Sequence, residues 1–313
     1  MSKTIAIIGS GAIGAFYGAR LLKAGHEVHF LFHSDYEHVR THGLRVDSVD
    51  GDMFFPQVSA YARPEDMPKC DLVLVATKTT TNGLLEKLLR PVCGPDSSVV
   101  LMQNGLNAER SVAGLGLGAT VLGCLCFVCC NKIGPGHVAH LEYGKVLLGH
   151  YRPDEQPAGL TPELEQAALA FESAGLAVEK SPDLILARWR KLFWNIAFNG
   201  PCAILGATTD RIVGCPATRQ LAQALMAEVR AGAQAVGRDI PESYIEDILV
   251  FTDKMAPYKP SMMLDAEHAR PLEVEAIYGE PLRTARDFGV ELPCVRTIYQ
   301  QLVFLDQHLR ESR

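Results

Sequence analysis

The sequence predicts an α/β protein, with an N-terminal Rossmann-type doubly wound sheet at residues 1–177 and a C-terminal all-helical domain at residues 178–313. Three observations predict this architecture. Short β-branched runs alternate with helical patterns through the first half of the chain, and helical patterns dominate after Pro182. A length of 313 residues is also more typical of two domains than of one.

The strands of the first half are hydrophobic runs bounded by turn residues. Parallel strands are expected at residues 3–8, 27–32, 71–77, 97–102 and 120–130. A helix is expected at residues 12–24, with Gly25 as its C-cap. The pair Asp50-Gly51 predicts a hairpin turn within residues 43–60.

The second half consists mainly of helical patterns. A helix at residues 162–174 leads to a short strand at 177–179. Ser181-Pro182-Asp183 then predicts a helix start, because serine is a good N-cap, proline suits the first helical position and an acid suits the positive end of the helix dipole. Further helices are expected at residues 217–236, 242–255, 271–288 and 294–309.

The composition excludes several classes of protein. Hydrophobic residues make up 48% and charged residues 21%, as in an ordinary globular protein. The net charge is −6 and no basic block stands out, so nucleic acid is not an expected partner. The longest strongly apolar stretch, residues 121–130, is much shorter than the ~20 residues of a membrane span. The N-terminus lacks the layout of a signal peptide, so a cytoplasmic location is expected.

Nine cysteines do not form the dense pattern of a disulfide scaffold. Cys126-x-x-Cys129, followed by His137 and His140, has the spacing of a zinc site. There is no second Cys-x-x-Cys, and the segment has the pattern of a buried strand. We therefore expect no metal.

A glycine-rich motif, Gly9-Ser10-Gly11-Ala12-Ile13-Gly14, fits G-x-G-x-x-G. It follows an expected strand and opens an expected helix, which is the context of a dinucleotide-binding loop. Gly9 permits the tight turn, Gly11 lets the backbone approach a pyrophosphate, and Gly14 lets helix and strand pack closely. The motif predicts cofactor binding by these six residues at a helix N-terminus. A tight turn without a ligand is the alternative.

The end of the second strand indicates which cofactor binds. An acid there would favour NAD, whereas this chain has His33 and Ser34, followed by Asp35. His33 and Ser34 could donate hydrogen bonds to a 2′-phosphate, so NADP (NADPH) is the expected cofactor. Asp35, two residues on, keeps NAD open as the alternative.

Two polar residues follow buried strands of the expected sheet. Lys78 comes directly after the strand ending at Thr77, and Asn104 follows the strand ending at Met102, within Gln103-Asn104-Gly105. Ligands of open α/β sheets bind at the carboxyl ends of the strands, so both side chains are expected in the cofactor crevice. A solvated lysine and a turn asparagine are the alternatives.

A polar stripe runs along an otherwise apolar helix in the second half. Lys191, Asn195 and Asn199 are spaced i, i+4, i+8 and fall within roughly an 80° arc. Most of their neighbours are large and apolar, so these polar groups need partners and a polar cavity or ligand is expected beside them. A partly desolvated lysine has a lowered pKa and can act as a general acid. The alternative is an exposed face of an amphipathic helix.

A last motif contains Ser261 and Glu273. Ser261 follows Pro260 where a helix is expected to begin, and Glu273 shares a helix face with Ile277 and Glu280. Alone, this segment would be interpreted as a helix with solvated acids.

In this order, these motifs resemble those of the ketopantoate reductase (2-dehydropantoate 2-reductase) family over nearly the whole chain. The resemblance implies a Rossmann domain and a helical domain with the active site between them. It also implies NADPH-dependent reduction of a 2-keto acid in pantothenate biosynthesis. By position, Lys191 would be the general acid and Glu273 would position or charge-balance the catalytic groups. The residues implied to bind substrate are Lys78, Asn104, Asn195, Asn199 and Ser261, and the first two would also touch the nicotinamide side.

Three departures from the family pattern concern specificity. The family often has arginine at the position of His33 and asparagine at the position of Tyr278. It also often has asparagine just before the pair Ser261-Met262, where this chain has Tyr258-Lys259-Pro260. The keto acid could therefore differ from ketopantoate. Two other functions stay open: reduction of another small 2-keto acid, and sensing of a dinucleotide without chemistry. The expected partner is a small 2-keto acid, with neither nucleic acid nor membrane, and a homodimer is left open.

Overall fold

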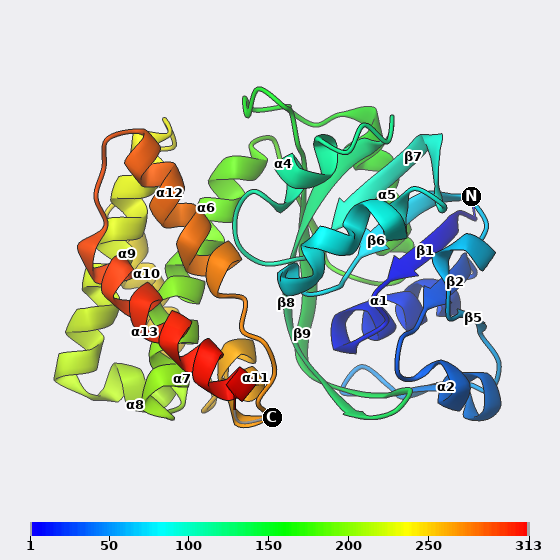
Figure 1. Cartoon of the computed structure of the whole chain (residues 1–313), viewed down its shortest axis with the longest axis horizontal. Coiled ribbons are helices and arrows are strands. Elements are labelled where there is room, and N and C mark those ends of the chain that lie inside the picture. The colour runs from blue at the N-terminus through cyan, green and yellow to red at the C-terminus, as the bar shows by residue number, and fades with distance from the viewer. Residues whose placement is uncertain (1, 312–313) are drawn as a thin grey trace. The chain divides into compact units, whose positions relative to one another are not determined.

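The computed structural model describes residues 2–311, which form two compact units. A ten-stranded sheet dominates the first unit (Figure 1). This sheet unit consists of the described residues up to Gln103 together with Ala108–Leu184. The helical unit consists of Asn104–Asn107 and the described residues from Ile185 onward. The Rossmann-type sheet and the helical C-terminal part are those that the sequence predicts.

The parallel part of the sheet has the order β7-β6-β1-β2-β5. The central strands β1 and β6 consist largely of β-branched and leucine residues, and Ile5, Ile7 and Ile8 of β1 are completely buried. Ile7 pairs with Phe30 on one side and Leu74 on the other. The bounds are β1 (Thr4–Ile8), β2 (Glu27–Leu31), β5 (Ser59–Tyr61), β6 (Cys70–Val75) and β7 (Cys93–Leu101).

A long antiparallel hairpin continues the sheet beyond β7. It consists of β8 (Thr120–Gly134) and β9 (His137–His150), and β9 was not predicted. Its polar middle, with Glu142 and Tyr143 exposed, breaks the alternation that marks a strand in the sequence. Beside β9 lie β3 (Leu44–Ser48), which pairs in turn with β4 (Met53–Phe55), and β10 (Val178–Ser181). The predicted hairpin turn is confirmed, and Gly51 has φ +104° there.

Helices and turns connect the strands. α1 (Ala12–Lys23) buries most of its length, and Gly18 lies so close to the Phe30 ring that a Cβ would collide with it. α5 (Pro162–Ser173) begins at Thr161, whose hydroxyl oxygen accepts the Leu164 N–H at 3.3 Å. The shorter elements are α2 (Tyr36–His42), η1 (Pro64–Asp66), η2 (Thr79–Leu84), α3 (Leu85–Leu89) and α4 (Ala108–Ala113).

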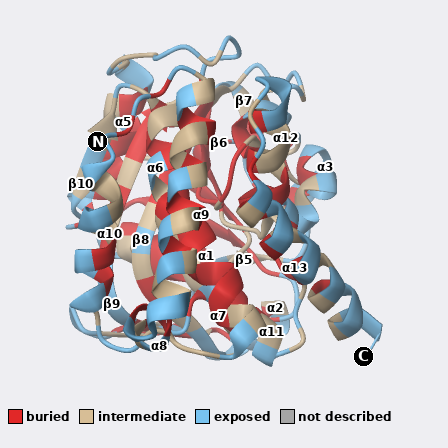
Figure 2. Cartoon of the chain, turned by 90° about the vertical axis from the view of Figure 1, so that its left-hand side faces the viewer, coloured by how far each residue is buried: buried red, intermediate tan, exposed pale blue. Residues whose placement is uncertain are grey.

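The helical unit packs around one apolar core. Trp189 and Phe193 of α6 are completely buried there, and Gly232 of α9 leaves room for the Trp189 ring. Figure 2 shows buried stretches along these helices and along the strands of the sheet. The helices are α6 (Leu184–Trp194), α7 (Gly200–Leu205), α8 (Thr209–Gly214), α9 (Pro216–Ala235), α10 (Ser243–Asp253), α11 (Ser261–Glu267), α12 (Glu280–Asp287) and α13 (Pro293–Glu311).

Two helix predictions were wrong in detail. Ser181 ends β10 and its hydroxyl accepts the Asp183 N–H at 3.3 Å, so this serine closes a local turn and α6 begins only at Leu184. The helix expected at 271–288 begins only at residue 274 and is not α-helical throughout. A π-helical turn, η4 (Glu275–Gly279), precedes α12, and a second one, η3 (Asn195–Asn199), follows α6. A period-3.6 pattern does not reveal such wide turns.

No helix among the described residues is long and apolar enough to cross a bilayer. Cys126 and Cys129, whose spacing suggested zinc, lie on β8 and form no disulfide; Cys129 is buried and Cys126 is half-buried. Within residues 2–311, no group of three or more His, Cys, Asp or Glu side chains is placed to hold a metal ion.

Candidate functional site

The glycine-rich loop, Gly9–Gly14, joins β1 to α1, and its three glycines stand in different surroundings. Gly9 has φ +94°, and a Cβ on it would lie 2.6 Å from the Thr77 backbone. A Cβ on Gly14 would collide with the Gly9 carbonyl oxygen. A Cβ on Gly11, by contrast, would meet no described atom within 4 Å. The fold therefore requires Gly9 and Gly14, while Gly11 keeps the backbone open toward free space.

A polar atom in this loop has no partner. The Ser10 hydroxyl oxygen is buried and makes no hydrogen bond with any described residue. It lies just before α1, where the first N–H groups of the helix lack intrahelical acceptors. An unsatisfied hydroxyl, an open glycine backbone and the positive end of a helix dipole fit the pyrophosphate of a dinucleotide. The residues present therefore fit the expected cofactor.

The end of β2 presents two exposed residues and one buried acid. His33 and Ser34 are exposed, whereas Asp35 is 5% exposed. The Asp35 carboxylate accepts from Lys132 Nζ at 2.6 Å, from the Gly136 N–H at 3.0 Å and from the Ser34 hydroxyl at 2.9 Å. Burial acts to raise the pKa of Asp35, but these hydrogen bonds outweigh it and the pKa is lowered. The acid is therefore ionised and already paired.

Lys132 was missed as a candidate from the sequence. It comes from β8, far from His33 in the chain, and its ammonium stands beside the end of β2 because it pairs with Asp35. Only the pairing of distant strands reveals this position, since Lys132 belongs to no motif.

Lys78 lies at the same edge of the sheet as the glycine-rich loop. It is half-buried, follows β6, and its carbonyl oxygen accepts from the Thr81 N–H and hydroxyl. Gln103, at the end of the next strand, donates to the Thr77 carbonyl at 2.9 Å and to Asn82 Oδ1 at 2.7 Å. These bonds tie together the loops that follow two neighbouring strands.

The predicted polar stripe lies in the helical unit. Lys191 is half-buried on α6, and Asn195 and Asn199 lie at the two ends of η3, 6% and 2% exposed. Asn195 Nδ2 and Asn199 Oδ1 find no hydrogen-bond partner within the described residues. An unsatisfied buried polar group costs about 1–3 kcal/mol, so both amides are suited to a ligand that supplies the missing partners.

Glu273 and Glu275 differ sharply in their surroundings. Glu273 is 8% exposed and lies two residues before the start of η4. Glu275 is exposed, forms an ion pair with Arg283 at 2.8 Å and accepts from the Tyr299 hydroxyl at 2.7 Å. The burial of Glu273 distinguishes it from the solvated acids of this helix, which the sequence pattern alone could not do.

In the π-helical turn η4, one backbone carbonyl accepts a hydrogen bond from residues 104–107. The Glu280 N–H donates to the Glu275 carbonyl, five residues back, and so leaves the Ala276 carbonyl available. The Leu106 N–H donates to Ala276 O at 3.0 Å. This bond anchors residues 104–107 on η4.

Asn104 therefore belongs to the helical unit, although it follows a strand of the sheet. Gly105 has φ +92° and touches Ala276, and Asn107 donates to the Glu280 carboxylate. Ser261 is exposed as the first residue of α11, which packs against η3 and α7. The candidate residues thus fall into two sets. The sheet unit holds the cofactor loop, His33, Ser34 and Lys78. The helical unit holds the candidate substrate-binding and catalytic residues Asn104, Lys191, Asn195, Asn199, Ser261 and Glu273.

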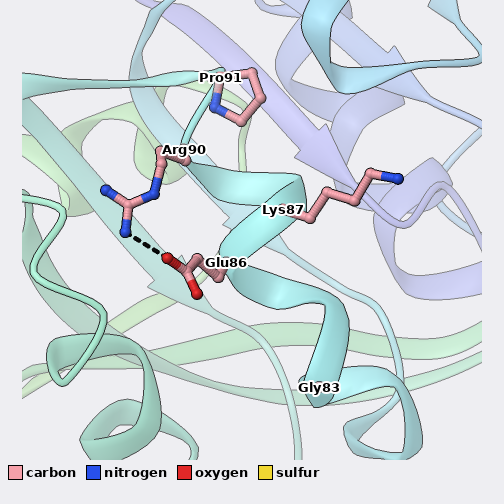
Figure 3. Close-up of a pocket in the computed structure, with 5 residues that line it drawn as sticks. All are labelled: Gly83, Glu86, Lys87, Arg90 and Pro91. Carbon is pink, nitrogen blue, oxygen red and sulfur yellow. Dashed lines mark hydrogen bonds and ion pairs between the residues drawn. The ribbon is translucent and has the colours of Figure 1, made fainter.

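A surface hollow of about 540 Å³ in the sheet unit contains none of these residues. Figure 3 shows its lining on α3 and on the residues that flank this helix; Arg90 and Glu86 form an ion pair at 2.6 Å, and Lys87 points away from them. Apart from Pro91, which is half-buried, its lining is exposed. It offers no buried polar group for chemistry.

Two family models match the chain. The model described as "Ketopantoate reductase PanE/ApbA" matches residues 5–153, and "Ketopantoate reductase PanE/ApbA C terminal" matches residues 183–306. Among curated relatives, a 2-dehydropantoate 2-reductase from Nostoc sp. is 48% identical over 308 residues, which cover 98% of this chain and 97% of that protein.

The chain is also similar to solved structures. The crystal structure of a 2-dehydropantoate 2-reductase from Geobacter metallireducens has a TM-score of 0.91 and 40% identity, and the match covers 96% of this chain and 98% of that one. A D-mandelate dehydrogenase solved with NADH and anilino(oxo)acetate has a TM-score of 0.89, with coverage of 98% and 99%. At 19% identity, this last likeness concerns the fold alone.

Proposed function

The chain belongs to the ketopantoate reductase family, and we propose that it reduces 2-dehydropantoate to pantoate with NADPH, as a cytoplasmic step of pantothenate biosynthesis. One observation carries the proposal: the buried amides of Asn195 and Asn199 each keep one polar atom without a partner, on the helical segment that continues from Lys191. This is the arrangement expected of a site whose hydrogen bonds a polar substrate completes.

The hydrogen-bonding groups of the substrate match the two amide atoms that have no partner among the described residues. Asn195 Nδ2 is a donor and Asn199 Oδ1 is an acceptor. 2-Dehydropantoate offers keto and carboxylate oxygens as acceptors and a hydroxyl as a donor. We assign an acceptor oxygen of the substrate to Asn195 and its hydroxyl to Asn199. Ser261, exposed at the start of α11, is assigned to the carboxylate end.

Lys191 is proposed as the general acid. When bound, the nicotinamide cofactor supplies the hydride that reduces the keto carbon. The oxygen of that carbon gains negative charge as the reaction proceeds, and the Lys191 ammonium would deliver a proton to it. Glu273 would hold a negative charge in the same unit, which favours the protonated lysine and limits its orientations. Asn104 and Lys78 are assigned to the substrate and the nicotinamide side.

The end of β2 supports NADPH as the cofactor. Asp35 would be the acid to bind the two ribose hydroxyls of NADH, but its carboxylate already accepts three hydrogen bonds. Lys132 adds a positive charge beside the exposed His33 and Ser34. A 2′-phosphate would meet donors and a cation there.

We expect kcat/KM to be higher with NADPH than with NADH, and the replacement Lys132→Met to reduce this preference. The variant removes the ammonium and leaves Asp35 without its counter-charge, so the phosphate loses attraction and gains repulsion. Initial rates with both cofactors measure the ratio. Lys145→Met, on β9, is the matched control because Lys145 pairs with Glu179 away from the end of β2. Equal ratios for the wild type and Lys132→Met would contradict this assignment.

A second candidate is the reduction of another small 2-keto acid. Two aromatic rings, Trp194 and Tyr258, lie 6.1 Å apart next to the stripe, and the indole N–H is buried without a partner among the described residues. These rings would suit a bulkier apolar substituent than that of ketopantoate.

Loss of NADPH absorbance with a panel of 2-keto acids tests the proposal. The highest kcat/KM is expected with 2-dehydropantoate. A higher value with a bulkier or aromatic keto acid would favour the second candidate. Tight NADPH binding without turnover of any keto acid would instead indicate a dinucleotide sensor.

A further inference from the structure

A tyrosine hydroxyl lies inside the backbone of the helix that carries the candidate substrate amides. The Tyr278 hydroxyl accepts from the Gly200 N–H at 2.7 Å and donates to the Ile196 carbonyl at 2.9 Å. Residues 196 and 200 are four apart, so in an α-helix these two backbone groups would bind each other. The hydroxyl therefore stands in place of one i→i−4 hydrogen bond, and it satisfies both groups.

The neighbouring residues suit this insertion. Gly200 has no Cβ, and one placed there would collide with the Tyr278 hydroxyl and lie 2.8 Å from both Tyr278 Cζ and Ile298 Cγ2. The next residue, Pro201, has no N–H, so it cannot close the following α-helical bond to Ala197. Both features keep the helix open at the point where the hydroxyl enters.

The opening coincides with η3 and changes the direction of the amides. In an α-helix, four residues overshoot one full turn by about 40°. A π-helical turn holds more residues per turn, so each residue rotates less, and Asn199 falls on the same side of Asn195 as Lys191 instead of on the opposite side. The three polar residues of the stripe, Lys191, Asn195 and Asn199, are thereby brought into a narrower arc than an uninterrupted α-helix would give.

We propose that Tyr278 is a positioning residue, whose hydroxyl holds η3 open and so aims Asn195 and Asn199 at the oxygens of the substrate. This inference rests on the proposed function. Tyr278 acts through the backbone of η3, from a side chain that is completely buried. Burial also raises the pKa of Tyr278 well above its ordinary value, so the hydroxyl remains a donor across the assay range.

The variant Tyr278→Phe tests the inference because it keeps the ring and removes the hydroxyl. Gly200 and Ile196 can then bind each other directly, and closing the turn rotates Asn199 to the other side of Asn195, away from Lys191. We expect KM for 2-dehydropantoate to rise by at least about tenfold, with the NADPH dissociation constant unchanged within about twofold, because the cofactor loop is in the other unit. A crystal structure of the variant should show Gly200 N about 3 Å from Ile196 O.

Tyr299→Phe is the matched control. It also removes one hydroxyl that binds the η4 segment, but the Tyr299 hydroxyl donates to the Glu275 side chain and not to the backbone of η3. Its KM should equal that of the wild type. Should Tyr278→Phe fold poorly, Gly200→Ala serves instead, because the added methyl displaces the hydroxyl while the tyrosine stays; the same rise in KM is expected.

A normal KM in folded Tyr278→Phe or Gly200→Ala, or an open turn in the variant crystal, would overturn the role of Tyr278. Failure of the wild type to reduce 2-dehydropantoate is a separate result, which contradicts the proposed function. The crystal structure of Tyr278→Phe, and KM for whichever keto acid the wild type does reduce, would then decide the inference.

Discussion

Replacing Lys191 with alanine is expected to lower kcat for keto-acid reduction by about 10²- to 10⁴-fold, the usual worth of a general acid. The variant lacks the proposed donor of a proton to the oxygen as it gains charge, so the reaction must draw the proton from water. The dissociation constant for NADPH should change little, because the cofactor loop is built from the sheet unit. Single-turnover and steady-state rates with saturating NADPH measure the effect.

Arg190→Ala is the control for Lys191→Ala. Arg190 is the neighbouring cation on α6, but it is exposed and its guanidinium lies over the Tyr244 ring, 5.8 Å from the ring centre. It should retain nearly the wild-type kcat. If Lys191→Ala and Arg190→Ala have similar rates, the stripe on α6 does not supply the proton.

Glu273→Ala is expected to reduce kcat/KM by more than about tenfold, or about 1.4 kcal/mol of transition-state stabilisation. In the proposed site the buried Glu273 carboxylate favours the charged form of Lys191, so its loss would let Lys191 give up its proton more easily. The alkaline limb of the pH–rate profile should therefore move to lower pH. A solvated acid would behave differently, because its removal typically changes the free energy of unfolding by less than about 0.5 kcal/mol and leaves kinetics intact.

Glu275→Ala serves as the control, since it removes a carboxylate two residues away that is exposed and paired with Arg283 and Tyr299. It should keep the wild-type pH profile. Superimposable profiles for Glu273→Ala and Glu275→Ala would show that Glu273 has no part in proton transfer.

Periodicity and turn chemistry were enough to predict most of the fold. The elements β1, β2, β6 and α1 end within two residues of the predicted bounds, because each is a mainly apolar segment closed by glycine or polar turn residues. β9 was not predicted because its side chains alternate poorly; it is held by pairing with β8, β3 and β10, which are non-local contacts.

The candidate site was predictable in its residue types but not in its shape. The spacing of Lys191, Asn195 and Asn199 predicted a shared face, yet nothing in that spacing indicates a π-helical turn. The turn depends on a hydroxyl that enters from residue 278, and the pairing of Lys132 with Asp35 depends on two strands distant in the chain. Contacts of this kind arise only when distant segments pack, so a local pattern cannot contain them.

The anchoring of residues 104–107 on η4 has a consequence for any attempt to divide or exchange the two units. The chain passes between them after Gln103, after Asn107 and after Leu184, so no single cut separates them. A fragment that starts at Ile185 would lack the Leu106 N–H that satisfies Ala276 and the Asn107 amide that binds Glu280. A chimera that takes its helical unit from a relative would need that relative's four-residue segment as well, because the segment and η4 form one hydrogen-bonded surface.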